Sequence, residues 1–407
     1  MEAAARPRRA DRRAADRAGF RLKDLLFLAH RAPFPPDRGD KIRSYHVLRH
    51  LARNWRVHLC TFAEQAAEQH LPPELQAELA SHSILRRTKP MAVAAMQALV
   101  TGKPISLAAF AHPGMARAVA DVRARHPIAA TYIFSGQMAQ YRGGEPTIMD
   151  MVDVDSAKFA SLAETTRPGM RAILKREARL LGRYERQVSR SVAATLFVSE
   201  AEAALFRSGG GKGNILAVEN GIDATRYDAA TVDPGTDDGP LIVFTGQMDY
   251  RPNIDAVTRF VEHILPLVRK ACPTVRFAIV GRAPTPAVRR LASDAVIVTG
   301  EVPDTRLWLA RAAVCVAPLD LARGIQNKLL EAMAMARPVV ASVPAAEGID
   351  HGGTIAVAGD DRDFARQVIA ALNGPADNPA ARARVLARYD WAARLAPLDC
   401  LLGDIAS

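Results

Sequence analysis

The chain has 407 residues, more than one compact core usually holds and suited to two domains of roughly 150 to 200 residues each. Hydrophobic residues make up 49% and charged residues 24%, a balance that excludes a disordered or fibrous chain. The formal net charge is +11, of which residues 1–23 carry +5, and the rest forms no basic stripe with interleaved aromatics, so we expect no nucleic-acid partner.

Residues 1–23 are predicted to be a flexible basic tail, because Arg and Ala alternate there without a sustained apolar face. This tail contains no apolar stretch of signal-peptide length, and no window of the chain approaches 18 consecutive apolar residues. We therefore expect a cytoplasmic protein, with attachment to the inner face of the cytoplasmic membrane as the alternative.

Residues 24–230 are predicted to form a first domain, a parallel sheet covered by helices, because short apolar runs alternate there with helical patterns. The apolar runs lie at residues 25–29, 57–62, 128–134, 147–151, 194–198 and 216–219. The apolar patch at 91–100, flanked by Lys89 and Lys103, is either core or a surface facing a membrane or a lipid-linked acceptor.

A long helix is predicted at residues 169–191. Its predicted apolar face holds Ile173, Leu180, Leu181, Tyr184 and Val188. The other face is crowded with Arg, which indicates a solvated face, and contact with an anionic membrane is the alternative.

Residues 231–240 are rich in turn formers and carboxylates and are predicted to link two domains. A second domain, residues 241–388, repeats the alternation of strands and helices. Its apolar runs lie at residues 241–245, 276–280, 295–298, 314–318 and 339–341. Residues 389–407 form a final helix that could cross back to the first domain.

The segment from Arg323 to Glu331 is the strongest candidate for ligand binding. Gly324 lets the backbone approach a ligand, and Asn327 is predicted to cap the helix that follows. The free amides of the first helical turn and Lys328 would favour a diphosphate, and Glu331 could accept hydrogen bonds from two ribose hydroxyls. An ordinary loop-to-helix turn with a solvated Glu is the alternative from spacing alone.

The loop 246–253 directly follows a predicted strand, and open α/β sheets bind ligands at such strand ends. Gly246 permits a tight turn, Arg251 supplies charge, and Asn253 is predicted to cap the next helix. A merely structural loop is equally compatible with this pattern.

Two loops of the first domain carry weaker signals. Gly39 lies between a strand and a helix, where a phosphate or sugar could approach. Asp150, Asp153 and Asp155 cluster at a strand end, where metal binding, hydroxyl recognition by Asp153 and helix capping by Asp155 or Ser156 all fit. The chain has no HExxH motif and no CxxC pair, so we expect no dedicated zinc site.

Ordered motifs along the chain resemble those of family 4 glycosyltransferases. They are RGIQNKLLEAMAMARPVVAS (323–342), Val198 to Glu200, Glu219 to Asp223, Ile279 to Gly281, Gly300 with Asp304, and Asp390 with Trp391. Further segments look like the sugar transferases associated with exosortase and PEP-CTERM exopolysaccharide systems, namely HRAPFPPDRGDKIRSYH (30–46), DMVDVDSAKF (150–159) and TGQMDYRPNIDAV (245–257).

The resemblance implies an α/β protein with the GT-B fold, in which two Rossmann-like parallel-sheet domains face a central cleft. It implies a hexosyltransferase that moves a sugar, with retention at the anomeric carbon, from a nucleoside diphosphate sugar to a glycan or lipid-linked acceptor in exopolysaccharide biosynthesis. The nucleotide sugar is a co-substrate, and neither a metal nor another cofactor is expected, because amides and cations can stabilise the leaving diphosphate.

The resemblance also implies roles for individual residues. The candidate catalytic residues are Lys328, Glu331 and Asp153. The candidate donor-binding residues are Gly246, Gln247, Arg251, Asn253, Arg282, Arg323, Gly324, Ile325, Asn327, Lys328, Leu329 and Glu331. The acceptor side of the cleft would be lined by Gly39, Asp40, Asp153, Ser199 and Asn220.

The chain departs from the family pattern at two places. Arg323 replaces the first glutamate of the family's pair, and Gln247 stands where the family has arginine. We expect Lys328, Arg251 and Arg323 to supply the positive charge toward the diphosphate. The alternatives are a catalytically degenerate scaffold and a nucleotide-sugar epimerase on the same fold, although these loops lack the acid and base groups that an epimerase needs.

Overall fold

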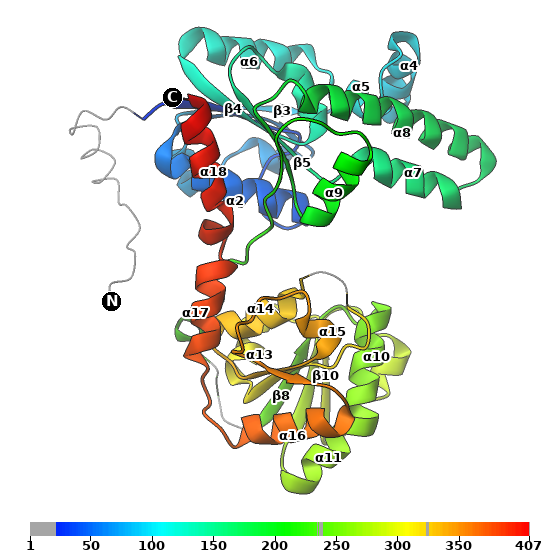
Figure 1. Ribbon diagram of the computed structural model, residues 1–407, viewed down its shortest axis with the longest axis vertical. Coiled ribbons are helices and arrows are strands. Elements are labelled where there is room, and N and C mark those ends of the chain that lie inside the picture. Colours follow the sequence, from blue (N-terminus) through cyan, green and yellow to red (C-terminus); the bar gives the residue numbers. More distant parts are fainter. Residues whose placement is uncertain (1–21, 234, 236–238, 323–324, 407) are drawn as a thin grey trace. The chain divides into compact units, whose positions relative to one another are not determined.

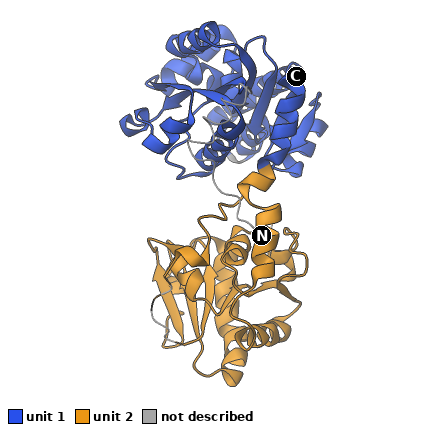
Figure 2. Ribbon diagram, turned by 90° about the vertical axis from the view of Figure 1, so that its left-hand side faces the viewer, with its two compact units in different colours: residues 1–220, 395–407 blue, residues 221–394 orange. Residues whose placement is uncertain are grey.

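The computed structural model describes residues 22–233, 235, 239–322 and 325–406 (Figure 1). Residues 1–21 of the predicted tail and residues 234 and 236–238 of the predicted linker lie outside the described part. The described residues form two compact units, one made of the chain up to Asn220 together with Leu395 onward, the other of Gly221–Arg394 (Figure 2). The division precedes the linker predicted at 231–240, because Ile222 forms a parallel β-bridge with Asp390 and is buried in the core of the second unit.

The first unit contains a parallel sheet of seven strands among its described residues, in the order β3-β2-β1-β4-β5-β6-β7. The strands are β1 (Asp24–Ala29), β2 (Arg56–Ala63), β3 (Ser81–Arg86), β4 (Ile128–Phe134), β5 (Thr147–Val152), β6 (Ala194–Phe197) and β7 (Ile215–Ala217). Every residue of β1 is buried, as expected for the central strand of a sheet covered on both faces. The partly exposed edge strand β3 was not predicted, because its sequence, SHSILR, is largely polar.

Helices cover both faces of this sheet (Figure 1). They are α2 (Gly39–Asn54), η1 (Ala66–Gln69), α3 (Pro73–Glu78), α4 (Met91–Thr101), α5 (Ile105–Phe110), α6 (Pro113–Arg125), η2 (Gly136–Tyr141), α7 (Asp155–Thr165), α8 (Pro168–Ser189) and α9 (Glu200–Ser208). The C-terminal helix α18 (Trp391–Ala406) starts in the second unit, and from Leu395 on it belongs to the first.

The buried face of α8 differs from the predicted one. It contains Leu174, Glu177, Leu181, Gly182, Glu185, Val188 and Ser189, whereas Ile173 is 46% exposed. The two glutamates are buried because their carboxylates accept hydrogen bonds from backbone amides at the N-termini of other helices. Glu177 accepts from the amides of Ile105 and Ser106, at 2.7 and 2.8 Å, where α5 begins. The acidic residues of α8 therefore pack inward, which no periodic pattern in the sequence indicated.

Helix α7 is also capped from a distance. Capping by Asp155 or Ser156 was one of the alternatives for the aspartate cluster, but the helix begins at Asp155 and has no side-chain cap of its own. Glu185 accepts from the Ser156 amide at 3.0 Å, and Glu202 accepts from the Val154 amide at 2.7 Å. Both contacts join segments far apart in the chain, so the capping alternative does not hold for Asp155 or Ser156.

Helix α4 exposes most of its apolar surface. Only Ala94 and Ala98 are buried, while the large side chains remain exposed: Met91 (58%), Val93 (51%), Met96 (68%), Leu99 (69%) and Val100 (84%). Of the two readings of residues 91–100, the structure therefore supports a surface. No helix in the described residues is both long and apolar enough to span a bilayer.

The second unit holds a parallel sheet of six strands among its described residues, in the order β10-β9-β8-β11-β12-β13. The strands are β8 (Leu241–Thr245), β9 (Arg276–Val280), β10 (Val296–Gly300), β11 (Val314–Ala317), β12 (Val339–Ser342) and β13 (Ala356–Ala358). The helices are η3 (Ala229–Thr231), α10 (Arg251–Arg259), the π-helical turn η4 (Phe260–Ile264), α11 (Leu265–Ala271), α12 (Pro286–Arg289), α13 (Thr305–Arg311), α14 (Asn327–Ala334), α15 (Val343–Ala346), α16 (Asp361–Leu372) and α17 (Pro379–Arg388).

Strand order reverses once in each sheet, between β1 and β4 in the first unit and between β8 and β11 in the second. Loops that leave the carboxyl ends of such strand pairs diverge to opposite faces of the sheet and leave a crevice where α/β proteins bind ligands. These two places define where candidate site residues should gather.

Candidate functional site

The reversal point of the second sheet brings the loop after β8 against the start of α14. Gly246 directly follows β8, and a Cβ atom there would lie 2.8 Å from Nδ2 of Asn253 and 3.4 Å from Nζ of Lys328. At Gly281, which has a φ of +153°, a Cβ atom would lie 1.7 Å from the Gly246 carbonyl oxygen. Gly281 therefore needs glycine, because a backbone oxygen blocks the Cβ position, and a Cβ atom at residue 246 would displace the Asn253 side chain.

Lys328 joins three elements of this site. Its Nζ donates to Oδ1 of Asn253 at 2.6 Å and lies 4.1 Å from the ring centroid of Phe244, on β8. Asn253 in turn donates from Nδ2 to the Gln247 carbonyl oxygen at 2.9 Å. Burial lowers the pKa of Lys328 to about 8, although the nearby Glu331 carboxylate opposes the shift. The amine is thus held in a place that disfavours its charge.

Glu331 lies one turn further along α14. Burial raises its pKa to about 7, against the opposing effects of a hydrogen bond with the Tyr227 phenol and the charge of Lys328. Burial likewise raises the pKa of Tyr227, and the Glu331 charge adds to this shift. The site therefore contains a carboxyl group and an amine whose charged forms are both poorly solvated, as is common where a protein binds a charged ligand.

Gln247 and Arg282 meet beside Gly246. With the Gln247 amide oriented so that its oxygen faces Arg282, that oxygen accepts from Nε at 3.0 Å and from Nη2 at 2.6 Å. The Met248 amide also donates to the Arg282 carbonyl at 2.9 Å, which fixes the two loops together. Arg251, in contrast, is 82% exposed and pairs with Asp255 at 2.8 Å along its own helix. Among the described candidates, Gly246, Gln247, Asn253, Arg282, Lys328 and Glu331 thus come together, and Arg251 points to solvent.

Two predicted helix caps are wrong. The residue before α14 is Gln326, with extended backbone, and Asn327 is already the first helical residue. Tyr250 precedes α10, so Asn253 lies inside the first turn of that helix. The Asn253 side chain hydrogen-bonds to Gln247 and Lys328 and does not cap the helix.

The remaining donor-side candidates lie on or beside α14. Leu329 is buried in the core and its amide donates to the Gln326 carbonyl at 3.0 Å. Ile325 is partly buried and packs against the same core. Arg323 and Gly324 lie outside the described residues.

At the reversal point of the first sheet, ion pairs bind the predicted Asp40 tightly. Its Oδ2 accepts from Nη1 of Arg31 at 2.7 Å and lies 3.5 Å from Nε2 of His30, which follows β1. Burial acts to raise the pKa of Asp40, but the hydrogen bonds with His30 and Arg31 outweigh it and hold the pKa well below its usual range. Gly39 has open space where a Cβ atom would lie, so no close approach requires glycine there.

A buried network missed by the sequence analysis lies near the same edge. Asp150 is fully buried and accepts from Nε of Arg43 at 2.9 Å and from the Tyr132 hydroxyl at 2.6 Å. Arg43 also donates through Nη1 to the Val218 carbonyl at 2.8 Å and to Oδ1 of the predicted Asn220 at 2.9 Å. The only sequence signal was the position of Arg43, one turn before Val47 on the apolar face of its helix.

The other acceptor-side candidates have local partners. Asp153 accepts from Nζ of Lys158 at 2.6 Å, and Ser199 caps α9 by accepting from the Glu202 amide at 3.2 Å. The backbone is strained nearby, since Ser135 and the β-branched Val152 have φ values of 77° and 69° at the ends of β4 and β5. In the part of the chain that the structure describes, the aspartates at 150–155 do not form a metal-binding group.

Comparison with known proteins shows which family and which relatives the sequence resembles. Residues 239–374 match the family model of glycosyl transferases group 1. The chain is 31% identical over 220 residues to a phosphatidyl-myo-inositol mannosyltransferase from Propionibacterium freudenreichii subsp. shermanii, covering 51% of this chain and 54% of that protein. The chain thus spans about half the length of this curated relative.

Solved structures resemble the chain over nearly its whole length. Anabaena HepE in complex with UDP has a TM-score of 0.55 at 16% identity, covering 94% of this chain and 100% of that chain. A glycosyltransferase from Rickettsia africae has a TM-score of 0.58 at 12% identity, with 94% and 98% covered. A UDP-forming trehalose-phosphate synthase from Burkholderia xenovorans has a TM-score of 0.56 at 12% identity, with 95% and 100% covered. The chain therefore has the GT-B fold of two Rossmann-like parallel-sheet units, and its second unit contains a region that matches glycosyl transferases group 1.

Proposed function

We propose that the protein is a glycosyltransferase that moves a sugar from a nucleoside diphosphate sugar to a glycan or lipid-linked acceptor. The observation that carries this proposal is the meeting of Gly246, Lys328 and Glu331 at the reversal point of the second sheet, inside the region that matches glycosyl transferases group 1. The relatives support it, because HepE was solved with UDP and with UDP-glucose, and the curated relative is a mannosyltransferase.

The donor would bind along the first turn of α14. The positive end of the helix dipole and the Lys328 amine would face the diphosphate, and Glu331 would accept hydrogen bonds from the ribose hydroxyls. Burial lowers the pKa of Lys328 to about 8, and a bound diphosphate would place negative charge beside the amine and so stabilise its charged form. Arg323, which precedes α14 in the sequence, would add further charge, whereas Arg251 is exposed and less suited to contact the donor.

In the transfer step, the bond between the anomeric carbon and the diphosphate oxygen breaks, the acceptor hydroxyl oxygen bonds to that carbon, and the hydroxyl proton passes to the leaving diphosphate. Negative charge grows on the leaving diphosphate, where preorganised amides and Lys328 stabilise it without a metal ion. Retention at the anomeric carbon, a role for Asp153 on the acceptor side and a place in exopolysaccharide biosynthesis are parts of the proposal that rest on family resemblance.

A lipid-linked acceptor would explain the exposed apolar surface of α4. The large side chains of this helix face solvent, and it contains no charged residue. Arg176 of α8 donates to the Ala98 carbonyl, which joins α4 to the arginine-rich helix, and Met170 and Ile173 at the start of α8 are also exposed. Apolar side chains beside Lys and Arg fit the interface of an anionic membrane leaflet, so we place the acceptor side of the enzyme there.

A thermal-shift screen tests donor binding. Full-length protein is heated alone and with UDP, GDP, TDP and their sugar conjugates, and we expect one base to raise the melting temperature clearly above the others. Glu331→Gln should reduce this stabilisation, and Glu347→Gln, which changes an exposed carboxylate of the same unit, is the control and should keep it. If none of these compounds stabilises the protein, the proposal is wrong. Binding of a nucleotide sugar without any slow hydrolysis would instead indicate the degenerate scaffold.

A further inference from the structure

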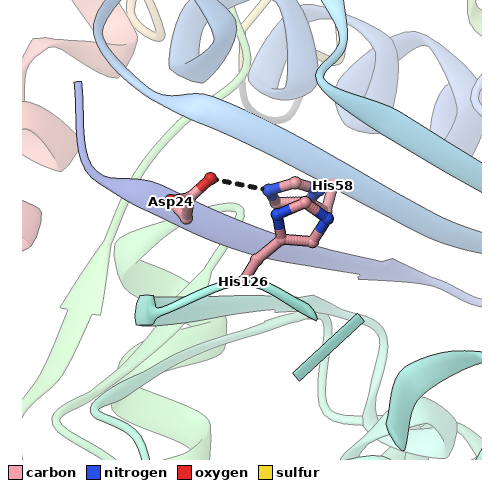
Figure 3. A group of neighbouring side chains, drawn as sticks. All are labelled: Asp24, His58 and His126. Atoms are coloured by element: carbon pink, nitrogen blue, oxygen red, sulfur yellow. Dashed lines mark hydrogen bonds and ion pairs between the residues drawn. The ribbon is translucent and has the colours of Figure 1, made fainter. Parts of the chain in front are cut away.

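Three potential metal ligands from separate segments converge at the amino edge of the first sheet (Figure 3). Asp24 is the first residue of β1, His58 lies near the start of β2, and His126 follows α6. One ligand atom of each residue lies within 4.8 Å of the other two. Asp24 and His58 are buried, whereas His126 is partly exposed.

The contacts within the cluster hold the two imidazole rings face to face, so the partly exposed His126 ring must turn before both rings direct a nitrogen lone pair at one ion. Nε2 of His58 lies 2.8 Å from Oδ1 of Asp24, and the ring of His126 stacks on that of His58 with centroids 4.1 Å apart (Figure 3). On its other side, Nδ1 of His58 lies 2.7 Å from Oγ of Ser81 on β3. A second-layer oxygen that holds the other ring nitrogen of a histidine is the usual arrangement around a metal-binding imidazole.

We infer that Asp24, His58 and His126 form a binding site for a divalent transition-metal ion, of which Zn²⁺ suits the ligands best. Two imidazole nitrogens and one carboxylate oxygen are ligands that Zn²⁺ binds in proteins, and water can take a fourth position from the partly exposed His126 side. Arg56 is the competing cation, with Nε 3.4 Å from Asp24, but its side chain is 51% exposed and can turn toward solvent.

The Ser81 hydroxyl allows the cluster to exist with or without the ion. In the empty site this hydroxyl can donate to Nδ1 of His58 while Nε2–H donates to Asp24. When the metal bonds to Nε2, the imidazole proton resides on Nδ1 and is donated to the Ser81 oxygen. His58 therefore changes tautomer but stays neutral, and the metal can bind without net loss of its proton.

The site is separate from the proposed sugar-transfer chemistry. The six residues of β1 span about 20 Å, and the reversal point lies at the carboxyl end of that strand. A metal at the amino end would instead join β1, β2 and the connection from α6 to β4, and would stabilise the folded unit. We expected no zinc site because the sequence has no HExxH motif and no CxxC pair, and these three ligands, spread between residues 24 and 126, form no such short motif.

Zinc titration of the full-length protein, stripped with a chelator and freed of any affinity tag, tests the site. We expect about one Zn²⁺ per chain by calorimetry and elemental analysis, and a rise in melting temperature of about 5 to 10 °C when free Zn²⁺ is about 100 times the Kd. Cobalt substitution should give visible d–d absorption of a low-symmetry nitrogen and oxygen site.

Variants separate a metal site from a purely structural cluster. His126→Ala removes the partly exposed ligand and should abolish zinc binding while the metal-free protein melts near the wild-type temperature. Asp24→Asn keeps a hydrogen-bonding side chain and should also lose zinc. His82→Ala, an exposed histidine on neighbouring β3, is the control and should bind normally. Absence of binding in the wild type, or full binding by both His126→Ala and Asp24→Asn, overturns the inference.

Discussion

Replacing Lys328 with methionine removes an amine whose charged form is destabilised by burial in the folded protein. An unfolded lysine has a pKa of about 10.4, whereas burial lowers that of Lys328 to about 8. This difference corresponds to about 3 kcal/mol against the charged amine. Because part of the side chain reaches solvent, we reduce the figure to about 1 to 2 kcal/mol. The lost hydrogen bond to Asn253 offsets about 1 kcal/mol, so the variant should be as stable as the wild type at pH 7, or slightly more stable.

The pH dependence gives the sharper result. Between pH 8 and pH 10.4 the unfolded chain keeps the lysine proton and the folded chain releases it, so this group makes the wild type more stable as pH rises. The methionine variant lacks this gain. The stability of the wild type relative to the variant should therefore rise by about 1 to 2 kcal/mol from pH 7.5 to pH 10.

Urea unfolding followed by tryptophan fluorescence measures this change, since Trp308 and Trp391 both lie in the second unit. Lys270→Met replaces an exposed lysine of the same unit and should show no comparable pH dependence relative to the wild type. Stabilisation by nucleoside diphosphate should be lost in Lys328→Met and kept in Lys270→Met. If the stability of the wild type relative to Lys328→Met does not change with pH, the site does not disfavour the charge of Lys328 and the reasoning fails.

Three further changes test other parts of the account. Measured by calorimetry, Glu331→Gln should weaken binding of the preferred nucleoside diphosphate about tenfold but leave binding of its 2′,3′-dideoxy analogue nearly unchanged. Equal losses of affinity for both ligands would show that Glu331 does not bind the ribose hydroxyls. Gly281→Ala would place a Cβ atom 1.7 Å from the Gly246 carbonyl oxygen, so it should lower the free energy of unfolding of the second unit by about 3 kcal/mol or more in urea unfolding. Gly300→Ala is the control, because no atom lies within 4 Å of the added Cβ, and it should lower the free energy of unfolding less. Leu99→Asp with Val100→Asp on α4 should release the protein from anionic vesicles in a sedimentation assay without lowering its melting temperature, and unchanged vesicle binding would show that α4 is not the docking surface.

The sequence predicted that Gly246, Lys328 and Glu331 lie close together, because the signals for this arrangement are local. Gly246 directly follows an apolar strand, and Lys328 and Glu331 are one turn apart on a helix after another strand. Strand ends on one edge of a parallel sheet lie close together, so strand pattern and loop composition were enough to bring these residues into one place. The resemblance to known transferases then indicated the ligand.

Long-range polar contacts could not be predicted in the same way. Arg43 and Asp150 form a buried pair across 107 residues, and neither has a neighbour in sequence that marks the contact. Glu177 and Glu185 were not among the residues of the predicted apolar face, yet they are buried and cap two other helices. A buried charged residue leaves no periodic pattern in the sequence, because its desolvation is compensated by hydrogen-bond partners that come together only in the folded chain.

Slow donor hydrolysis without acceptor tests the central claim most directly. Full-length protein is incubated with UDP-, GDP- and TDP-linked sugars, and the release of nucleoside diphosphate is measured over time. We predict release from one class of donor, lost in Lys328→Met and retained in Lys270→Met. If no donor is hydrolysed, or if Lys328→Met hydrolyses it as fast as the wild type, the α14 site is not the transferase site proposed for this protein.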